Sequence, residues 1–150
     1  MASTLTQMYV HCIFHTKNNV HIKKENLNEL YSYIGGIIKE TDSSPIQIGG
    51  TENHLHILVS LSKTISMSDF INKIKSGSSN WIKKKYPFYK NFSWQNGYGA
   101  FSVSQSLLKR TIIYIEKQEK HHKKTTFKEE YEAFLKAYNI EFDEKYAFVD

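Results

Sequence analysis

The sequence is poor in several residues that would point to particular kinds of protein. It has one cysteine, Cys12, so an internal disulfide is excluded, and the apolar neighbours of the thiol favour a buried, unreactive role. With only 2 prolines and 7 glycines, and 40% hydrophobic residues, the chain is not of the disordered or linker-rich kind. It contains no apolar run of membrane-spanning length and no N-terminal signal-peptide pattern. We therefore expect one cytoplasmic domain over residues 1–150, with a C-terminal helix and tail (about 126–150) packing on it or on a partner subunit.

Arginine is almost absent too. Arg110 is the only one, so the net charge of +5 and the pI of about 9.1 rest on lysine. A basic balance fits a nucleic-acid partner, although unrelated soluble proteins share it. Lysine contacts phosphate as a point charge, whereas bidentate recognition of guanine usually needs arginine. If the chain binds DNA, contacts to the backbone should outweigh arginine-mediated base reading.

Hydrophobic periodicity predicts alternating strands and helices. Strands are predicted at residues 8–15, 46–50, 54–59, 92–95 and 100–104, and helices at 26–39, 66–85, 105–120 and 127–138. Small polar residues at 76–80 predict an interruption of the second helix. The order β-α-β-β-α-β-β-α-α predicts an α+β fold, an antiparallel sheet with helices packed chiefly on one face.

Two histidines separated by one residue stand out on the third predicted strand. Alternate side chains of a strand share a face, so His54 and His56 lie side by side while Leu55 points the other way. Neighbouring imidazoles on a rigid strand make half of a metal site. The simpler alternative is a pair of hydrogen-bonded strand histidines.

A tyrosine and a glutamine share one face of the helix predicted at 105–120. Tyr114 and Gln118 are four residues apart, which places them one turn apart. Such a pair alone is more often a surface contact. Together with His54 and His56, the amide oxygen of Gln118 would hold a divalent cation with positions left for substrate oxygens. The Tyr114 hydroxyl would then attack a phosphodiester, forming a phosphotyrosine that reverses without a nucleotide cofactor.

These residues, in this order, resemble the single-tyrosine HUH transposases of the smallest bacterial insertion sequences, the TnpA-type enzymes and their REP-associated relatives. The resemblance covers most of the chain through several separate motifs: Gly49-Gly50, His54-Leu55-His56, Leu58-Val59-Ser60-Leu61, Lys75-Ser76-Gly77-Ser78-Ser79, Trp94-Gln95-Asn96-Gly97-Tyr98, Phe101-Ser102-Val103-Ser104, Tyr114-Ile115 with Gln118, His121-His122, Phe127, Glu129-Glu130-Tyr131 and Asp143-Glu144. It implies an RRM/ferredoxin-like HUH fold and strand transfer on single-stranded DNA. Cleavage would leave a 5′-phosphotyrosine and a free 3′-hydroxyl.

The resemblance also assigns roles and partners. It implies Tyr114 as nucleophile, His54, His56 and Gln118 as metal ligands, and Mg²⁺ or Mn²⁺ as the ion. It implies a homodimer that acts on single-stranded DNA with a subterminal hairpin, in the bacterial cytoplasm at the nucleoid. We expect DNA contacts from basic and small polar residues on two predicted helices, namely Lys73, Lys75, Ser78, Lys109 and Arg110.

Two departures and several alternatives remain open. Asn53 stands where the family often has an acidic residue, and Ser62-Lys63 follows the Leu-Val-Ser-Leu run where a proline is common. Asn53 would affect how His54 is oriented. The alternatives are a non-catalytic single-stranded nucleic-acid-binding module and a metal-dependent phosphoesterase that uses water. Whether the tyrosine helix docks on its own subunit or on its partner, and whether the element is mobile or domesticated, also stay open.

Overall fold

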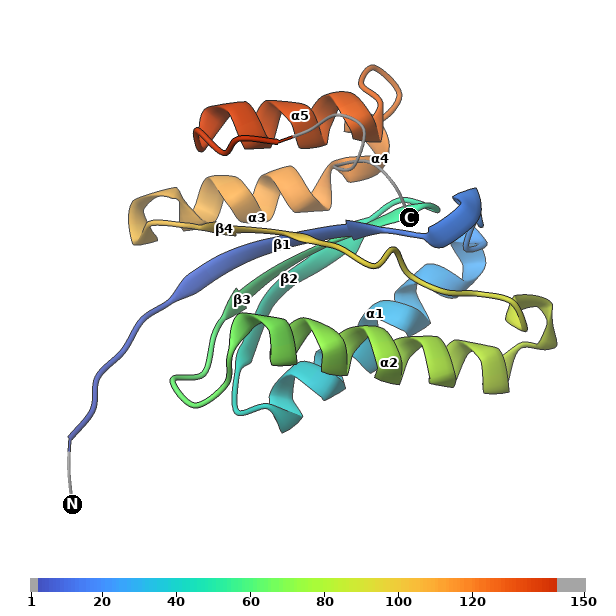
Figure 1. Ribbon diagram of the computed structural model, residues 1–150, viewed down its shortest axis with the longest axis horizontal. Helices are drawn as coiled ribbons and strands as arrows, with labels where there is room; N and C mark the ends of the chain where they lie inside the picture. Colours follow the sequence, from blue (N-terminus) through green and yellow to red (C-terminus); the bar gives the residue numbers. More distant parts are fainter. Residues whose placement is uncertain (1–2, 143–150) are drawn as a thin grey trace.

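A four-stranded antiparallel sheet is the centre of the fold (Figure 1). The structure, a computed structural model, describes residues 3–142. Its strands are β1 (Tyr9–His15), β2 (Ser44–Gly50), β3 (His54–Ser60) and β4 (Gly99–Ser102), paired antiparallel in the order β2-β3-β1-β4. The predicted α+β class with an antiparallel sheet is confirmed.

Helices cover both faces of this sheet, whereas the sequence pattern predicts one chiefly covered face. One face carries α1 (Lys24–Glu40) and α2 (Met67–Lys85), and the other carries α3 (Leu108–Glu116), α4 (Gln118–His121) and α5 (Phe127–Ala137) (Figure 1). Short 3-10 turns occur at Lys17–Asn19, Pro87–Tyr89 and Gln105–Leu107. The predicted tail of the C-terminal segment lies outside the described residues from position 143 onward, while α5 packs on the sheet of its own chain.

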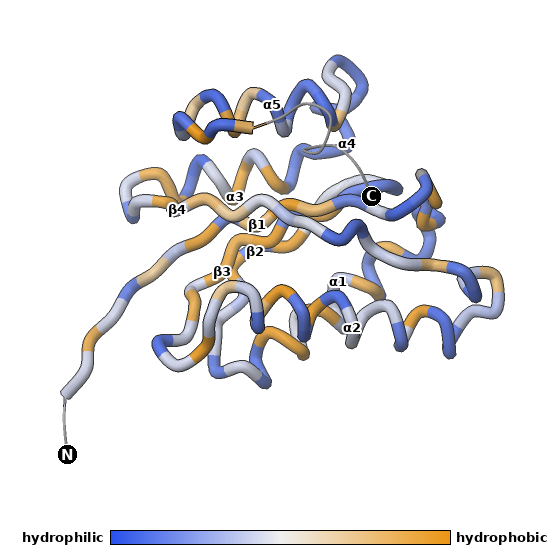
Figure 2. The backbone as a smooth tube through the Cα atoms, viewed as in Figure 1, coloured by the Kyte–Doolittle hydropathy of each residue, from blue (hydrophilic) through white to orange (hydrophobic). Residues whose placement is uncertain are grey.

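The reason for two covered faces is the composition of the central strands. Cys12, Leu55 and Ile57 point into the main core with α1 and α2. Ile13 points the other way and packs with Tyr131 in a second cluster beneath α5. The central strands are coloured mainly as hydrophobic in Figure 2, while each helix alternates between hydrophobic and hydrophilic residues. A strand that is apolar on both sides needs a packing layer on each side.

Three predicted elements differ from the structure, because contacts within the fold outweigh the local sequence pattern. The helix predicted at 105–120 breaks at Lys117 into α3 and α4. Trp94, predicted to lie in a strand, forms only an isolated bridge to Thr16, because its ring packs on Phe14 and its indole N–H donates to Ser78. No other pairing is assigned to residues 92–95 in the described structure.

The predicted interruption at 76–80 is wrong, because α2 runs through these residues. The hydroxyl of Ser76 donates to the carbonyl of Asn72, which satisfies it within the helix. At Gly77 an added Cβ would lie 2.8 Å from the Ile37 side chain, so the small residue lets α1 and α2 approach. By contrast, the predicted start of α2 is confirmed, since Ser66 accepts from the backbone N–H of Asp69.

Within residues 3–142, none of the helices is both long enough and apolar enough to cross a membrane.

Candidate active site

The two strand histidines lie on the face of the sheet covered by α3, α4 and α5. The side chains of both are buried, with relative exposures of 2% for His54 and 0% for His56. Leu55 between them belongs to the core on the opposite face. The predicted side-by-side placement is therefore present, on a strand held between β1 and β2.

His54 is oriented by the loop that precedes it. Its Nδ1 lies 2.9 Å from Asn53 Oδ1 and 2.8 Å from Thr51 Oγ1, and that hydroxyl in turn donates to Asn53 Oδ1. The Asn53 oxygen is an acceptor, so these contacts assign the proton of a neutral His54 to Nδ1. Burial, and then the neighbouring His56, lower the His54 pKa to about 3, so the neutral ring prevails at pH 7. Nε2 is left with a free lone pair.

His56 is held by a third histidine that the sequence analysis did not connect with the site. His11 on β1 places its Nε2 2.7 Å from His56 Nδ1, and both rings are buried. Burial, and then the nearby His56, lower the His11 pKa to about 3. This contact fixes the plane of the His56 ring and directs its Nε2 toward α5.

Tyr114 and Gln118 both reach the histidine pair even though the helix breaks between them. Gln118 is buried at the start of α4, with its Oε1 3.1 Å from His54 Nε2. The Tyr114 ring, near the end of α3, lies with its centroid 5.8 Å from that of His56. The chain therefore brings His54, His56, Tyr114 and Gln118 together within one subunit.

A carboxylate from α5 lies between these groups. Glu130 is 3% exposed, and its Oε1 is 3.0 Å from His56 Nε2, 3.3 Å from His122 Nε2 and 3.7 Å from His54 Nε2. Its other oxygen, Oε2, accepts hydrogen bonds from the Tyr114 hydroxyl and, at 3.2 Å, from Gln118 Nε2. One oxygen thus faces three imidazoles, and the other faces the tyrosine and His121, whose Nε2 is 3.3 Å from Oε2.

These contacts set the charge of Glu130 and of Tyr114. Burial raises the pKa of Glu130, but the neighbouring His122, His56 and Tyr114 outweigh burial and hold that pKa well below its usual range. Burial, then the hydrogen bond to Glu130 and its charge, raise the pKa of Tyr114. In this arrangement the carboxylate is ionised and the phenol keeps its proton.

Glu130 and His122 are the site residues that sequence reasoning missed. A signal was present, because Glu130 follows Phe127 by three residues and precedes Phe134 by four, which places a charge on the apolar face of the last helix. A charged side chain on such a face is seldom buried without partners. His122 occurs in the His121-His122 motif, but no local rule connects it with the site, because its position depends on the turn between α4 and α5.

The donor atoms fit a divalent cation. His54, His56, His122 and Glu130 each offer one ligand atom, and these atoms all lie within 4.8 Å of one another. The neutral His54 and the ionised Glu130 are in the protonation states that metal binding requires. Carboxylate and amide oxygens added to imidazoles suit Mn²⁺ or Mg²⁺ better than imidazoles alone.

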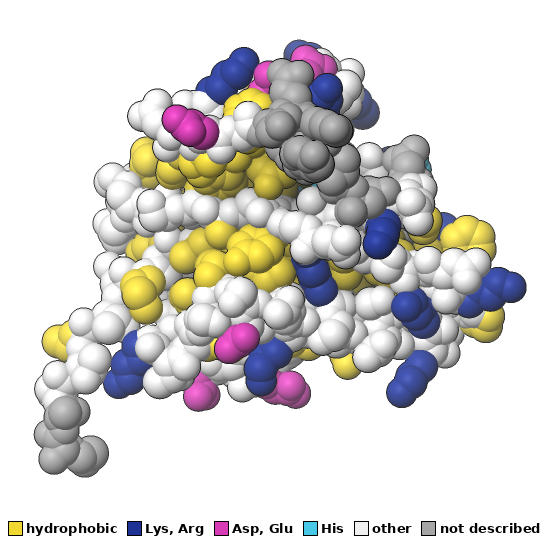
Figure 3. Space-filling view, in the orientation of Figure 1, with side chains coloured by type: hydrophobic (Ala, Val, Ile, Leu, Met, Phe, Trp, Pro, Cys, Tyr) yellow, Lys and Arg dark blue, Asp and Glu magenta, His cyan; other side chains and the backbone are white. Residues whose placement is uncertain are grey.

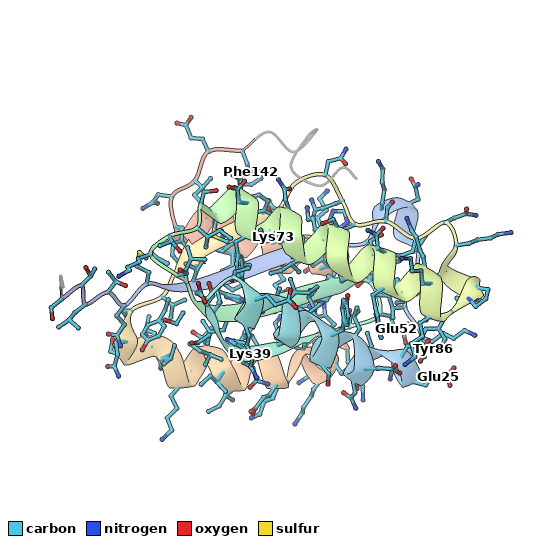
Figure 4. The ribbon with its side chains drawn as sticks, turned by 90° about the horizontal axis from the view of Figure 1, so that it is seen from below. Glu25, Lys39, Glu52, Lys73, Tyr86 and Phe142 are labelled. Carbon is cyan, nitrogen blue, oxygen red and sulfur yellow. The ribbon has the colours of Figure 1, made fainter. Side chains whose placement is uncertain are left out.

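The residues expected to contact DNA are not brought together. Lys73 lies on α2 (Figure 4), whereas Lys109 and Arg110 are exposed on α3, across the sheet. The Lys75 ammonium donates to the carbonyls of Gln95 (2.7 Å) and Gly97 (2.6 Å), and partial burial lowers its pKa to about 8. It therefore fixes the loop before β4.

Ser78, also expected to contact DNA, is fully buried. Its hydroxyl donates to the Ile74 carbonyl and accepts from Trp94, so the folded chain uses it for packing between α2 and the loop at Trp94. A DNA contact of Ser78 stays a prediction, and in this structure the hydroxyl faces the core.

A cavity of about 370 Å³ opens beside the tyrosine, between α3 and α5. Its walls include Tyr114, His121, Phe134 and Tyr138, and hydrophobic side chains are visible beneath α5 in Figure 3. An apolar, aromatic hollow of this kind suits a flat ring.

Comparison with known proteins extends the description of the fold. The family profile described as "Transposase IS200 like" matches residues 4–118. A protein of Deinococcus radiodurans assigned as a transposase has a TM-score of 0.61 and 18% identity, covering 79% of this chain and 95% of that one. A REP-associated tyrosine transposase bound to a REP hairpin has a TM-score of 0.58 and 12% identity, covering 81% and 74% respectively. Among curated proteins, none matches. At these identities the two structures establish likeness of fold.

Proposed function

The chain belongs to the IS200-like transposase family, and from this premise we propose that it cleaves and rejoins single-stranded DNA through a 5′-phosphotyrosine on Tyr114. The natural substrate is the end of an insertion sequence, carried on a strand with a subterminal hairpin. The proposal rests on the family and on the side chains of the site.

One observation carries it. The Tyr114 hydroxyl and the imidazoles of His54 and His56 converge on the same buried carboxylate, Glu130. A nucleophile and a set of candidate metal ligands are thus next to each other in one chain. A binding module has no use for that arrangement, which costs the desolvation of several ionisable groups.

The chemistry follows from the groups present. Tyr114 Oη attacks the phosphorus, the Oη–P bond forms as the P–O3′ bond breaks, the phenol releases its proton and the departing 3′ oxygen takes one up. His54, His56 and Gln118 would hold Mg²⁺ or Mn²⁺, which supplies charge stabilisation at the phosphodiester. Because a phenolate is also a leaving group, a 3′-hydroxyl reverses the step and rejoins strands.

The DNA partner is recognised by its backbone and by base stacking. The lysine-rich, arginine-poor composition favours phosphate contacts. The cavity beside Tyr114 has aromatic walls, Phe134 and Tyr138, on which a base next to the scissile phosphate stacks. The solved relative named above is bound to a REP hairpin, which supports a hairpin-bearing substrate here. We also propose that the protein acts as a homodimer.

The test is denaturing electrophoresis of the protein with labelled single-stranded DNA from both flanks of its own gene, in Mn²⁺ or EDTA. We expect a metal-dependent covalent adduct that Tyr114→Phe abolishes. Tyr33→Phe is the matched control, because Tyr33 lies on α1 across the sheet, where it stacks on Trp81. It should form the adduct normally.

Other outcomes favour the alternatives. An adduct that persists in Tyr114→Phe would sink the assignment of the nucleophile. Cleavage without an adduct would favour hydrolysis by water. Salt-sensitive binding of the same DNA, with neither cleavage nor adduct, would favour the binding module.

A further inference from the structure

We propose that Glu130 of α5 is a ligand of the metal site and, through its second oxygen, the residue that positions the Tyr114 hydroxyl beside it. His122 joins the same site, so the histidine pair is completed by groups from α4–α5 in addition to Gln118. This inference rests on the proposed function for the use of the metal, but its test requires no DNA.

The division of the carboxylate supports a bridging role. Oε1 lies within 3.7 Å of the Nε2 atoms of His54, His56 and His122. Oε2 accepts from Tyr114 and Gln118, contacts none of those three imidazoles, and lies 3.3 Å from Nε2 of His121. A side chain that served only to neutralise histidines would not need one oxygen committed to the tyrosine hydroxyl. Glu130 thereby sets the distance between the metal ligands and the nucleophile.

A second observation, the contact between His54 and Gln118, also points to a cation. The contacts to Asn53 and Thr51 place the proton of His54 on Nδ1, so its Nε2 is an acceptor. That nitrogen faces Gln118 Oε1 at 3.1 Å, and the Gln118 amide is oriented by donation from its nitrogen to Glu130. Two acceptor atoms, both buried, therefore face each other. A bound cation turns this unfavourable contact into shared coordination.

His122 supplies a further open donor. Its Nε2 is buried and, among the described residues, has no hydrogen-bond partner of good geometry, although Glu130 Oε1 is 3.3 Å away. Both His122 and Glu130 lie beyond the segment matched by the family profile, which ends at residue 118. His122 directly follows α4, and Glu130 lies in α5.

The experiment is a Mn²⁺ titration of the full-length protein, with free Mn²⁺ followed by its electron paramagnetic resonance signal. We expect one Mn²⁺ per chain, at least tenfold weaker binding by Glu130→Gln, and similar weakening by His122→Asn. Glu132→Gln, on the same helix and paired with Lys136, is the matched control and should bind normally.

Each outcome either supports or overturns the role of Glu130 and His122 as metal ligands. His122 is half-buried at the end of α4, so His122→Asn keeps the test valid if Glu130→Gln fails to fold. Wild-type-like binding by both variants, or no Mn²⁺ binding by the parent, would overturn the inference. If the parent forms the DNA adduct while Glu130→Gln binds Mn²⁺ fully, the inference fails and the proposed function stands. If Mn²⁺ binding depends on Glu130 but no adduct forms, the inference stands and the proposed function fails.

Discussion

At the scale of single residues, burial decides which reactive side chains take part in chemistry. Tyr114 and Cys12 are both nucleophiles in principle, and burial raises the pKa of each. Tyr114 lies beside a cavity and a carboxylate. Cys12 points into the main core, where it is fully buried among apolar side chains. The thiol is therefore a packing group, as the sequence predicts.

Cys12 has a measurable effect on stability at high pH. The folded chain keeps the thiol proton above pH 9, whereas the unfolded chain releases it, because burial raises the folded pKa. The stabilisation is present below about pH 9 and lost as pH rises, by about 1.4 kcal/mol per pH unit. The free energy of unfolding in urea should be measured for wild type and Cys12→Ala at pH 7.5 and 10. We expect the wild type to lose about 1.4 kcal/mol more than Cys12→Ala between these two pH values. An equal loss of stability in both proteins would contradict this prediction, because it would mean that the thiol ionises in the folded chain as readily as in the unfolded chain.

Residue patterns predict the site only where its members are close in sequence. His54 and His56 are two residues apart on one strand, and Tyr114 and Gln118 are four apart, so local periodicity suffices to place each pair. Glu130 and His11 reach the same site through the packing of α5 and β1, which no local rule predicts. Conversely, Ser78 looked polar and accessible in sequence, yet it is fully buried.

At the scale of elements, the position of Tyr114 depends on how closely α3 approaches β2. Gly49 pairs with His56 across the strands. A Cβ at Gly49 would lie 2.8 Å from the Ile115 carbonyl oxygen and 2.9 Å from its Cγ2. The missing side chain therefore lets α3 lie directly on the sheet. The residue before Ile115 is the tyrosine, so this contact places it beside His56.

Gly49→Ala should consequently act on both stability and chemistry. The added methyl meets the backbone of α3, so we expect unfolding to be easier by about 1–3 kcal/mol. Formation of the DNA adduct should fall with it, since Tyr114 moves with the helix. Gly36→Ala in α1 is the control, because nothing lies within 4 Å of a Cβ there, and it should stabilise by about 0.4–1 kcal/mol. A Gly49→Ala protein as stable and active as the parent would contradict this account of the contact.

Element boundaries also show what local patterns leave out. The apolar set of residues 105–120 predicts one helix, but the chain breaks at Lys117, and this break separates Gln118 from the last turn of α3. The tertiary contacts of Gln118 with His54 and Glu130 outweigh the continuity of the helix. In α2, by contrast, helix–helix contact at Gly77 outweighs the local weakness of a serine- and glycine-rich stretch.

At the scale of the whole molecule, the site lies in one layer, between the sheet and the C-terminal helices (Figure 1). The strands supply the histidines, α3 and α4 supply Tyr114 and Gln118, and α5 covers them with Glu130. Every one of these groups comes from the same chain. For a dimer to exchange its tyrosine helices, α3 would have to leave its contact with Gly49, and Tyr114 its hydrogen bond to Glu130.

The prediction at this scale is that two inactive variants do not restore one another. Tyr114→Phe retains the histidines and His56→Ala retains the tyrosine, so a partner-assembled site would combine the intact halves in mixed dimers. With an affinity tag on the His56→Ala chain, we expect no adduct on either chain in Mn²⁺ with hairpin-bearing single-stranded DNA, while the tagged parent reacts. An adduct on the tagged chain would mean that its Tyr114 reached the partner's histidines. In that case, the contacts of α3 with Gly49 and Glu130 would be broken during the reaction, and stabilising them should slow adduct formation.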